Sequence, residues 1–108
     1  MPEHDPLSGV ILDESISISL RELCRSCDTH AEWVLALVNE GILTPIENDP
    51  TRLRFAGSSV KIAYTAKRLQ SDLGLNFAGI ALALDLLSEL EQLRARVARL
   101  SDLDQPHE

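Results

Sequence analysis

Residues 83–100 read ALDLLSELEQLRARVARL, and this stretch decides how the chain folds and assembles. Its apolar residues recur at alternating intervals of three and four, the pattern of the a and d positions of a coiled coil. These residues could serve packing inside one chain only, but the length of the pattern favours pairing with a second copy. We call this set the seam: Ala83, Leu86, Leu90, Leu93, Val97 and Leu100.

The charges beside the seam are sorted along its length. Acids come first and bases follow: Asp85, Glu89 and Glu91, then Arg94, Arg96 and Arg99. In a parallel pair, like charges would face each other at both ends, whereas in an antiparallel pair the acidic half of one helix faces the basic half of the other. The order also suits the helix dipole. The sequence therefore predicts an antiparallel homodimer.

Length and composition limit what else the chain can be. Its 108 residues suffice for one domain, or for a small domain with a dimerisation helix, and at 4% aromatic residues aliphatic side chains must build the core. No apolar run approaches the ~20 residues of a membrane span, and no basic and apolar leader is present. Two cysteines, Cys24 and Cys27, fit a reducing compartment. We expect a cytoplasmic protein.

The net charge of −7 is unevenly distributed. Residues 1–15 carry four acids and no Lys or Arg (Glu3, Asp5, Asp13 and Glu14), and are predicted to form a flexible acidic N-terminal arm. Residues 104–108 are predicted to be a disordered tail. An acidic surface repels phosphate and attracts basic protein faces. The sequence has no Gly-rich phosphate loop and no recognisable nucleophile–base motif, so we expect neither an enzyme nor a cofactor.

Local signals predict a helix-turn-helix near the start of the folded part. Capping boxes at Ser19–Glu22 and Thr29–Glu32 would begin two helices, with Asp28 at the turn between them. The first helix has one apolar face, and the second runs to Glu40, after which Gly41 supplies the left-handed position that ends a helix.

Further signals predict a wing and two more helices. Ile16 and Ile18 alternate with serines in a short extended segment, and residues 46–55 form a polar turn followed by a β-like run, a two-stranded wing. A third helix opens at residues 57–59, runs to about Asp72 and ends at Gly74. Its inward positions are Val60, Ala63, Tyr64, Ala66 and Leu69.

The final helix is predicted from Phe77 to Leu103, capped by Asn76. Its first half is apolar on a second face and should pack on its own domain through Phe77, Ile80, Ala81, Leu84 and Leu87. The predicted fold is mainly α, with a winged helix-turn-helix domain over residues 16–76 and a dimerisation helix over residues 77–103.

This order of elements resembles the MerR-type winged helix-turn-helix proteins, and within them the CbpM family of bacterial chaperone modulators. The most specific segment is LGLNFAGI at residues 73–80, which leads into a leucine-rich helix. More general matches are LRELC at residues 20–24, VNEGILTP at residues 38–45, Arg68-Leu69 and GIALAL at residues 79–84. The resemblance implies a protein that binds the J-domain of a DnaJ-like co-chaperone, CbpA, and inhibits it.

A MerR-like DNA-binding transcriptional regulator is the alternative. Members that read DNA typically carry an Arg followed by aromatic residues in the second helix, where this chain has Leu35. They carry another Arg in the wing, where Leu53 stands here between Arg52 and Arg54. The second helix has acids and no base, and phosphate contacts depend on Lys or Arg. We therefore predict that DNA binding is lost.

The same helix offers a candidate surface for a protein partner. Trp33 and Leu35 lie off its best inward stripe, with acids beside them. Trp33 could instead fold back onto the wing or the third helix, and the acids could be a solvated face. The predicted contacts are Asp28, Glu32, Trp33, Leu35 and Glu40.

Two other patterns have an ordinary structural interpretation. The spacing of Cys24, Cys27 and His30 invites a metal site, but a structural zinc needs four ligands, and both cysteines fit the apolar face of their helix. No metal is therefore predicted. Lys61, Lys67 and Arg68 could form a weak anion patch on the third helix, but three bases fit a solvated face better.

Overall fold

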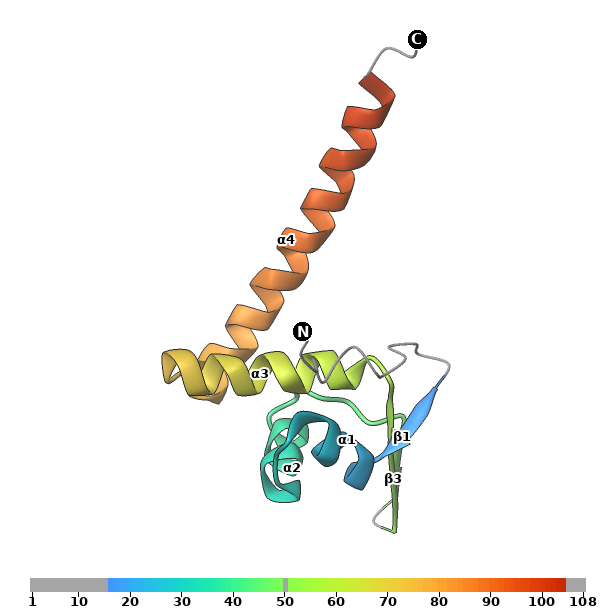
Figure 1. The fold of residues 1–108 in the computed structure, drawn as a ribbon, viewed down its shortest axis with the longest axis vertical. Coiled ribbons are helices and arrows are strands. Elements are labelled where there is room, and N and C mark those ends of the chain that lie inside the picture. Colours follow the sequence, from blue (N-terminus) through green and yellow to red (C-terminus); the bar gives the residue numbers. More distant parts are fainter. Residues whose placement is uncertain (1–15, 50, 105–108) are drawn as a thin grey trace, which may run out of the picture.

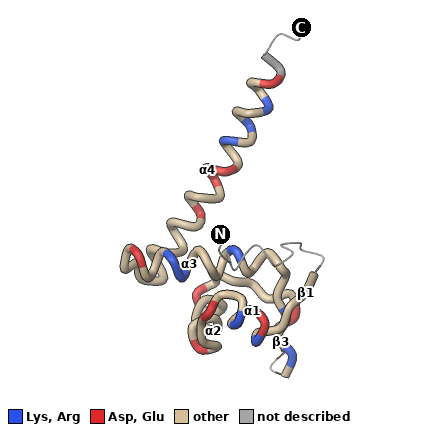
Figure 2. The backbone as a smooth tube through the Cα atoms, viewed as in Figure 1, with Lys and Arg blue, Asp and Glu red and all other residues tan. Residues whose placement is uncertain are grey.

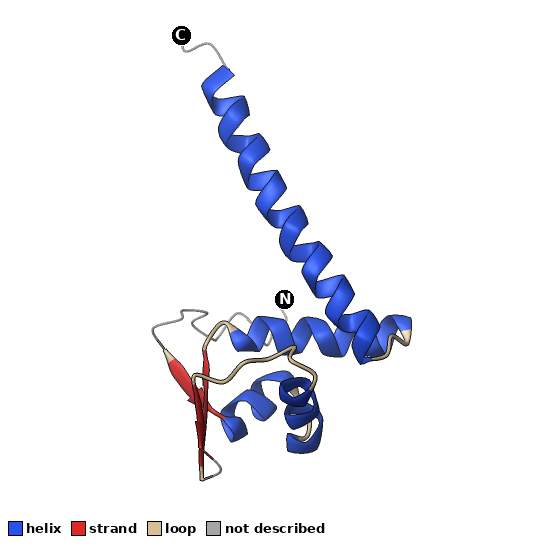
Figure 3. Cartoon of the chain, turned by 180° about the vertical axis from the view of Figure 1, so that it is seen from behind, coloured by secondary structure: helices blue, strands red, loops and turns tan. Residues whose placement is uncertain are grey.

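The computed structural model describes residues 16–49 and 51–104, so the predicted arm and most of the predicted tail lie outside the described residues. The elements form a helical domain with a small sheet at one end, from which one long helix projects (Figures 1 and 3). In chain order they are β1 (Ser17–Ser19), α1 (Leu20–Cys27), α2 (Ala31–Asn39), β2 (Glu47–Asp49), β3 (Arg52–Ala56), α3 (Ser59–Leu73) and α4 (Phe77–Asp104).

The sheet has three antiparallel strands in the order β1-β3-β2, one more than the predicted wing. The hairpin β2–β3 is the wing, in the register that pairs Asn48 with Leu53. The extended segment at Ile18 joins it as β1, opposite Phe55 on β3. Because Ile18 packs against the core and Phe55 is fully buried, this pairing ties the segment before α1 to the wing.

The first capping box is confirmed. The Ser19 hydroxyl accepts a hydrogen bond from the Glu22 amide at 3.1 Å, and the Glu22 carboxylate accepts one from the Ser19 amide at 2.8 Å. Hydrogen bonds to the Glu22 carboxylate, first from the Ser19 amide and then from the Ser19 side chain, lower the pKa of Glu22, because they favour its charged form. At the other end of α1, Asp28 takes a left-handed conformation with φ of 53°, so the helix stops there.

The second capping box is wrong. The N-cap of α2 is His30, one residue later than predicted, and no side chain caps this helix end. Glu32 therefore occupies the second helical position, from which it cannot complete a box with Thr29. The turn between the helices is residues 28–30 and contains Asp28 as predicted, and Gly41 has the predicted left-handed conformation with φ of 77°.

A single core joins α1, α2, the sheet and α3. Val60, Ala63 and Ala66 are the fully buried inward positions of α3, while Tyr64 and Leu69 are partly buried against the same core. The other buried apolar side chains come from each of the packed elements: Leu23, Cys27, Val34, Leu37, Leu43, Phe55 and Ile80.

The N-terminal part of helix α4 packs on the domain, and the rest of the helix projects away from it (Figure 1). The side chain of Asn76 accepts a hydrogen bond from the Gly79 amide at 2.8 Å, which confirms the predicted cap. Ile80 is fully buried, and Phe77 and Leu84 pack against the core. Leu87, expected to pack on the domain, is 42% exposed, because it lines an open groove between α4 and α3 and is not part of the core. The 28 residues of α4 form a rod ~42 Å long.

Lys67 of α3 forms hydrogen bonds with the C-terminal end of α1. Its ammonium donates to the carbonyl oxygen of Cys27 at 3.2 Å and also to that of Asp28. These carbonyls belong to the C-terminal end of α1, where a cation also complements the helix dipole.

Replacing Lys67 by Met should lower the free energy of unfolding by about 1–2 kcal/mol, because it removes charge-assisted hydrogen bonds. Urea denaturation at fixed protein concentration measures the effect. Lys61→Met is the matched control, because the ion pair that Lys61 forms within the described ranges, with Glu91, is exposed. This substitution should change stability by less than about 0.5 kcal/mol. Equal effects of the two substitutions would contradict this role of Lys67.

Candidate protein-binding face

The outward face of α2 is acidic and apolar. Leu35 is 43% exposed, and Glu32 and Glu40 are exposed on either side of it in the sequence. Asp28, at the turn before α2, is exposed as well. Helix α2 contains no Lys or Arg, as Figure 2 shows by the absence of blue along it. We call Asp28, Glu32, Leu35 and Glu40 the α2 face.

Trp33 lies differently from the other predicted contacts. It is partly buried and packs against the core, so only part of its ring is available to a partner. Its indole Nε1 is buried and has no hydrogen-bond partner among the residues that the structure describes. A buried donor without a partner costs free energy, because it loses its hydrogen bond to water. This feature depends on three-dimensional packing, and no pattern in the sequence indicates it.

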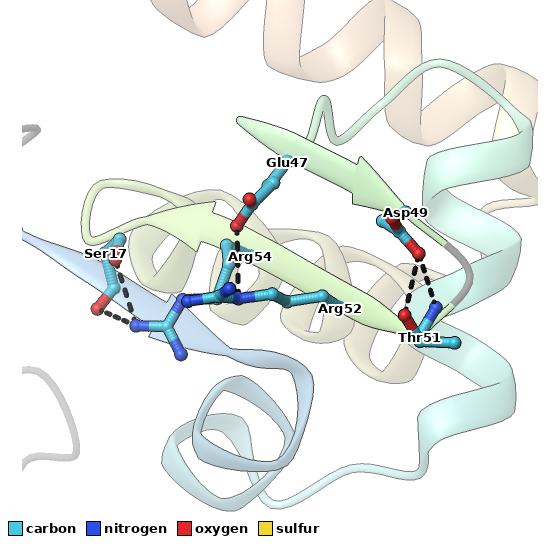
Figure 4. A network of polar contacts seen from close by, with 6 residues as sticks. All are labelled: Ser17, Glu47, Asp49, Thr51, Arg52 and Arg54. Atoms are coloured by element: carbon cyan, nitrogen blue, oxygen red, sulfur yellow. Dashed lines mark hydrogen bonds and ion pairs between the residues drawn. The ribbon is translucent and has the colours of Figure 1, made fainter.

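A DNA-binding regulator would use Arg52, Arg54, Lys61 and Arg68 for phosphate contacts, and all four are already engaged within the chain. In the wing, Arg52 Nε lies 3.7 Å from Glu47 Oε1, and Arg54 Nη2 donates to the Ser17 carbonyl oxygen and hydroxyl at 2.9 Å each (Figure 4). On α3, Lys61 pairs with Glu91 at 3.5 Å and Arg68 with Asp72 at 3.0 Å. Binding to a phosphate backbone would have to replace these contacts.

Both cysteines are packed in the interior of the domain, Cys27 fully and Cys24 partly. Cys27 is 3% exposed, and its thiol donates to the Val60 carbonyl oxygen at 3.6 Å, while Cys24 is partly buried. Burial raises the pKa of Cys24, and it raises the pKa of Cys27 to about 11. Among the described residues, no group of three or more His, Cys, Asp or Glu side chains is arranged to hold a metal ion.

Cys27 should therefore resist thiol reagents in the folded protein. At pH 8 a pKa of about 11 leaves roughly one thiol in a thousand ionised, so almost no Cys27 thiolate is available to react in the folded state. Titration with Ellman's reagent should modify Cys24 first and Cys27 only on unfolding. The Cys24→Ala variant should remove the faster phase, and equal rates for both thiols would contradict the burial of Cys27.

The seam forms an uncovered apolar stripe on α4. The exposed fractions of Leu86, Leu90, Leu93, Val97 and Leu100 lie between 41% and 60%. Large apolar side chains in such a continuous row are typical of an interaction surface. Figure 2 also shows the sorted charges, with acids in the first part of α4 and bases further along.

A groove between α3 and α4 was not predicted. It has a volume of about 430 Å³ and an apolar floor that includes Ile62, Leu84 and Leu87. The ion pair between Lys61 and Glu91 joins its two walls. Sequence reasoning missed this groove because its walls come from helices whose facing residues lie far apart in the chain.

The helix-turn-helix, the wing and the projecting helix are the parts of a MerR-type protein. Residues 18–102 match the model of the MerR HTH family of regulatory proteins. No helix in the described ranges is both long and apolar enough to cross a membrane.

Comparison with curated relatives identifies one family within the MerR-type class. The chain is 34% identical over 85 residues to the chaperone modulatory protein CbpM of Pseudomonas entomophila, an alignment that covers 79% of this chain and 84% of the relative. It is 31% identical over 94 residues to CbpM of Coxiella burnetii strain Dugway, covering 87% and 89% of the two chains. The chain therefore belongs to the CbpM family of MerR-type regulatory proteins, as its sequence motifs indicated.

Proposed function

We propose that this protein is a chaperone modulator that binds the J-domain of a DnaJ-like co-chaperone of the CbpA type and inhibits it. The supporting observation is the α2 face, which stands where a DNA reader would carry its recognition helix but presents exposed acids and an exposed leucine. The relatives' name, chaperone modulatory protein, agrees with this role.

Inhibition needs no chemistry at this face. J-domains that resemble that of DnaJ carry a basic helix followed by a His-Pro-Asp loop that engages the main chaperone. Opposite charges on the two surfaces would speed their encounter and orient them, and Leu35 with the exposed part of Trp33 would supply apolar contact. A J-domain covered in this way cannot recruit its chaperone, so the mechanism is competition for one surface.

We further propose that the seam forms an antiparallel coiled coil between two copies. Residues 16–76 would then be the binding domain of each copy, and residues 77–103 its dimerisation helix. The exposure of the seam supports this arrangement, because burying one such leucine contributes about 1.5–3 kcal/mol.

Calorimetric titration of the full chain with the J-domain of a CbpA-type co-chaperone tests the proposed function. We expect saturable binding and a matching loss of co-chaperone-stimulated ATP hydrolysis by the main chaperone. Absence of heat and of inhibition would reject the proposal.

A MerR-like DNA regulator is the second candidate, because the family model and the arginines of the wing belong to that class. A gel shift at low salt separates the two functions. Duplex binding that weakens steeply as salt rises would favour the regulator.

A further inference from the structure

The groove between α3 and α4 is open in a single chain. Leu87 lines it and is 42% exposed, although this leucine belongs neither to the core nor to the seam. The ion pair between Lys61 of α3 and Glu91 of α4 joins the walls of the groove at 3.5 Å, and both of its side chains are more than half exposed. An exposed apolar side chain beside exposed charges suits contact with another polypeptide.

The positions beside the seam differ between the two halves of α4. In the heptad numbering that makes Leu90 an a position and Leu93 a d position, Leu87 and Arg94 both fall at position e. Position e lies at the edge of the seam, and it is apolar in the first half of the helix and basic in the second. An Arg side chain covers apolar surface with its methylene groups while its guanidinium stays in water. The second half of one α4 therefore complements the first half of another.

The register of the proposed antiparallel coiled coil brings one basic residue of the second copy to this groove. When Leu90 of one copy faces Leu93 of the other, the e positions of the two helices follow the same edge. Arg94 of the second copy then lies midway between Leu87 and Glu91, ~3 Å from the level of each along the helix axis. Both of these residues lie on the side of α4 that lines the groove, four positions apart.

Glu91 can pair with a second cation while it keeps Lys61. A carboxylate has two oxygens and accepts several hydrogen bonds, and the Glu91 side chain is 67% exposed in its pair with Lys61. Arg94 of the same chain lies three residues after Glu91, yet it forms no ion pair among the described residues. The Glu91 carboxylate would then stand between a cation of its own domain and a cation of the second copy.

We propose that Arg94 of the second copy closes the groove, once in each copy, a contact that rests on the antiparallel dimer of the proposed function. Its methylene groups cover Leu87, and its guanidinium pairs with Glu91 beside Lys61. The groove is therefore complete only in the dimer. Because Lys61 belongs to α3 and Glu91 to α4, the contact fixes the angle between α4 and the domain, so that assembly positions the two binding domains.

Disulfide cross-linking of the full chain tests the placement of Arg94. Leu87→Cys with Arg94→Cys, in a Cys24→Ala background, puts two thiols in one helix ~10 Å apart, too far for a bond within the chain. We expect mild oxidation to yield covalent dimers, in which peptide mapping finds position 87 of one copy bonded to position 94 of the other. Ser88→Cys with Ala95→Cys is the matched control. It has the same spacing at f positions, which face away from the seam, and should remain unlinked.

A double-mutant cycle tests the ion pair. Sedimentation equilibrium gives the dissociation constant of the dimer for Arg94→Gln, for Glu91→Gln and for both together. Each single substitution should raise this constant about fivefold, and the pair should raise it no further, because either one removes the same contact. A contact between Arg94 and Glu91 within one chain would contribute equally to monomer and dimer, so it would not produce this result.

The outcomes separate this contact from the dimer itself. A chain that sediments as a dimer but forms no bond between positions 87 and 94, or whose two Gln substitutions act independently, would reject the closure of the groove by Arg94 and leave the coiled coil standing. A wild-type chain that is monomeric at micromolar concentration would reject the coiled coil and the closure with it. None of these readouts involves a co-chaperone, so a failed co-chaperone titration leaves both tests intact.

Discussion

Replacing Leu90 and Leu93 by Asp should abolish the proposed dimer and leave the chain monomeric. In an antiparallel pair centred on the seam, Leu90 of one copy faces Leu93 of the other, so the double variant places four carboxylates at the centre of the interface. Each lost leucine forfeits about 2–3 kcal/mol of burial, and unpaired charges in an apolar seam cost several kcal/mol more. The dissociation constant should rise at least roughly a thousandfold, as measured by sedimentation equilibrium.

The matched control is Ser88→Asp with Ala95→Asp. It adds the same charge to α4 at two exposed positions seven residues apart, on a stripe that the seam does not include. This control should remain dimeric. If Leu90→Asp/Leu93→Asp is still dimeric, or if the wild-type chain is a monomer at micromolar concentration, the proposed coiled coil is wrong.

A charge exchange distinguishes the two orientations of the pair. In the antiparallel arrangement Glu89 flanks the seam opposite Arg96 of the other copy, whereas in a parallel one it lies opposite Arg94. Glu89→Arg alone should weaken either dimer. Adding Arg96→Glu restores opposite charges only in the antiparallel arrangement, so recovery of the dimer would support that orientation.

Reversing two charges on the α2 face should weaken binding to the J-domain strongly. We expect Glu32→Lys combined with Glu40→Lys to raise the dissociation constant at least tenfold, because two attractions for a basic helix become repulsions. Both side chains are exposed and form no ion pair within the described residues, so folding and dimerisation should be unchanged. Calorimetry measures the affinity, and circular dichroism checks the fold.

Asp85→Lys with Asp102→Lys is the control for that experiment. It makes the same change in net charge, but on exposed positions of α4. Affinity should fall much less than in the α2 variant. The reverse result would be unchanged J-domain affinity for the α2 variant and reduced affinity for the α4 control. It would place the interface at the groove that Asp85 helps to line.

Local signals in the sequence predicted much of the fold, because the groups that form them are close in the chain. The box at Ser19 and Glu22, the left-handed glycines Gly41 and Gly74, and the cap at Asn76 all lie within a few residues of the helix ends they define. The box at Thr29 failed because the competing start at His30 differs by only one residue.

Features that depend on distant residues were beyond the sequence patterns. The pairing of β1 with β3 joins residues that are distant in the chain, such as Ile18 and Phe55, which are 37 positions apart. A short extended segment carries no sequence pattern that identifies the strand it pairs with. The same holds for the groove between α3 and α4 and for the buried indole of Trp33. The exposed acids of α2 could be predicted, because a helical period alone assigns them to the outward side.

The length of α4 has a consequence for stoichiometry. If α4, a helix ~42 Å long, pairs antiparallel with its copy, the length of the helix sets the distance between the two binding domains, which lie at opposite ends of the pair. A partner with two binding sites at that spacing would bind both domains at once and gain avidity, whereas a partner with one binding site would not. Shortening α4 by whole heptads should abolish this gain in avidity, while each binding domain keeps its own affinity.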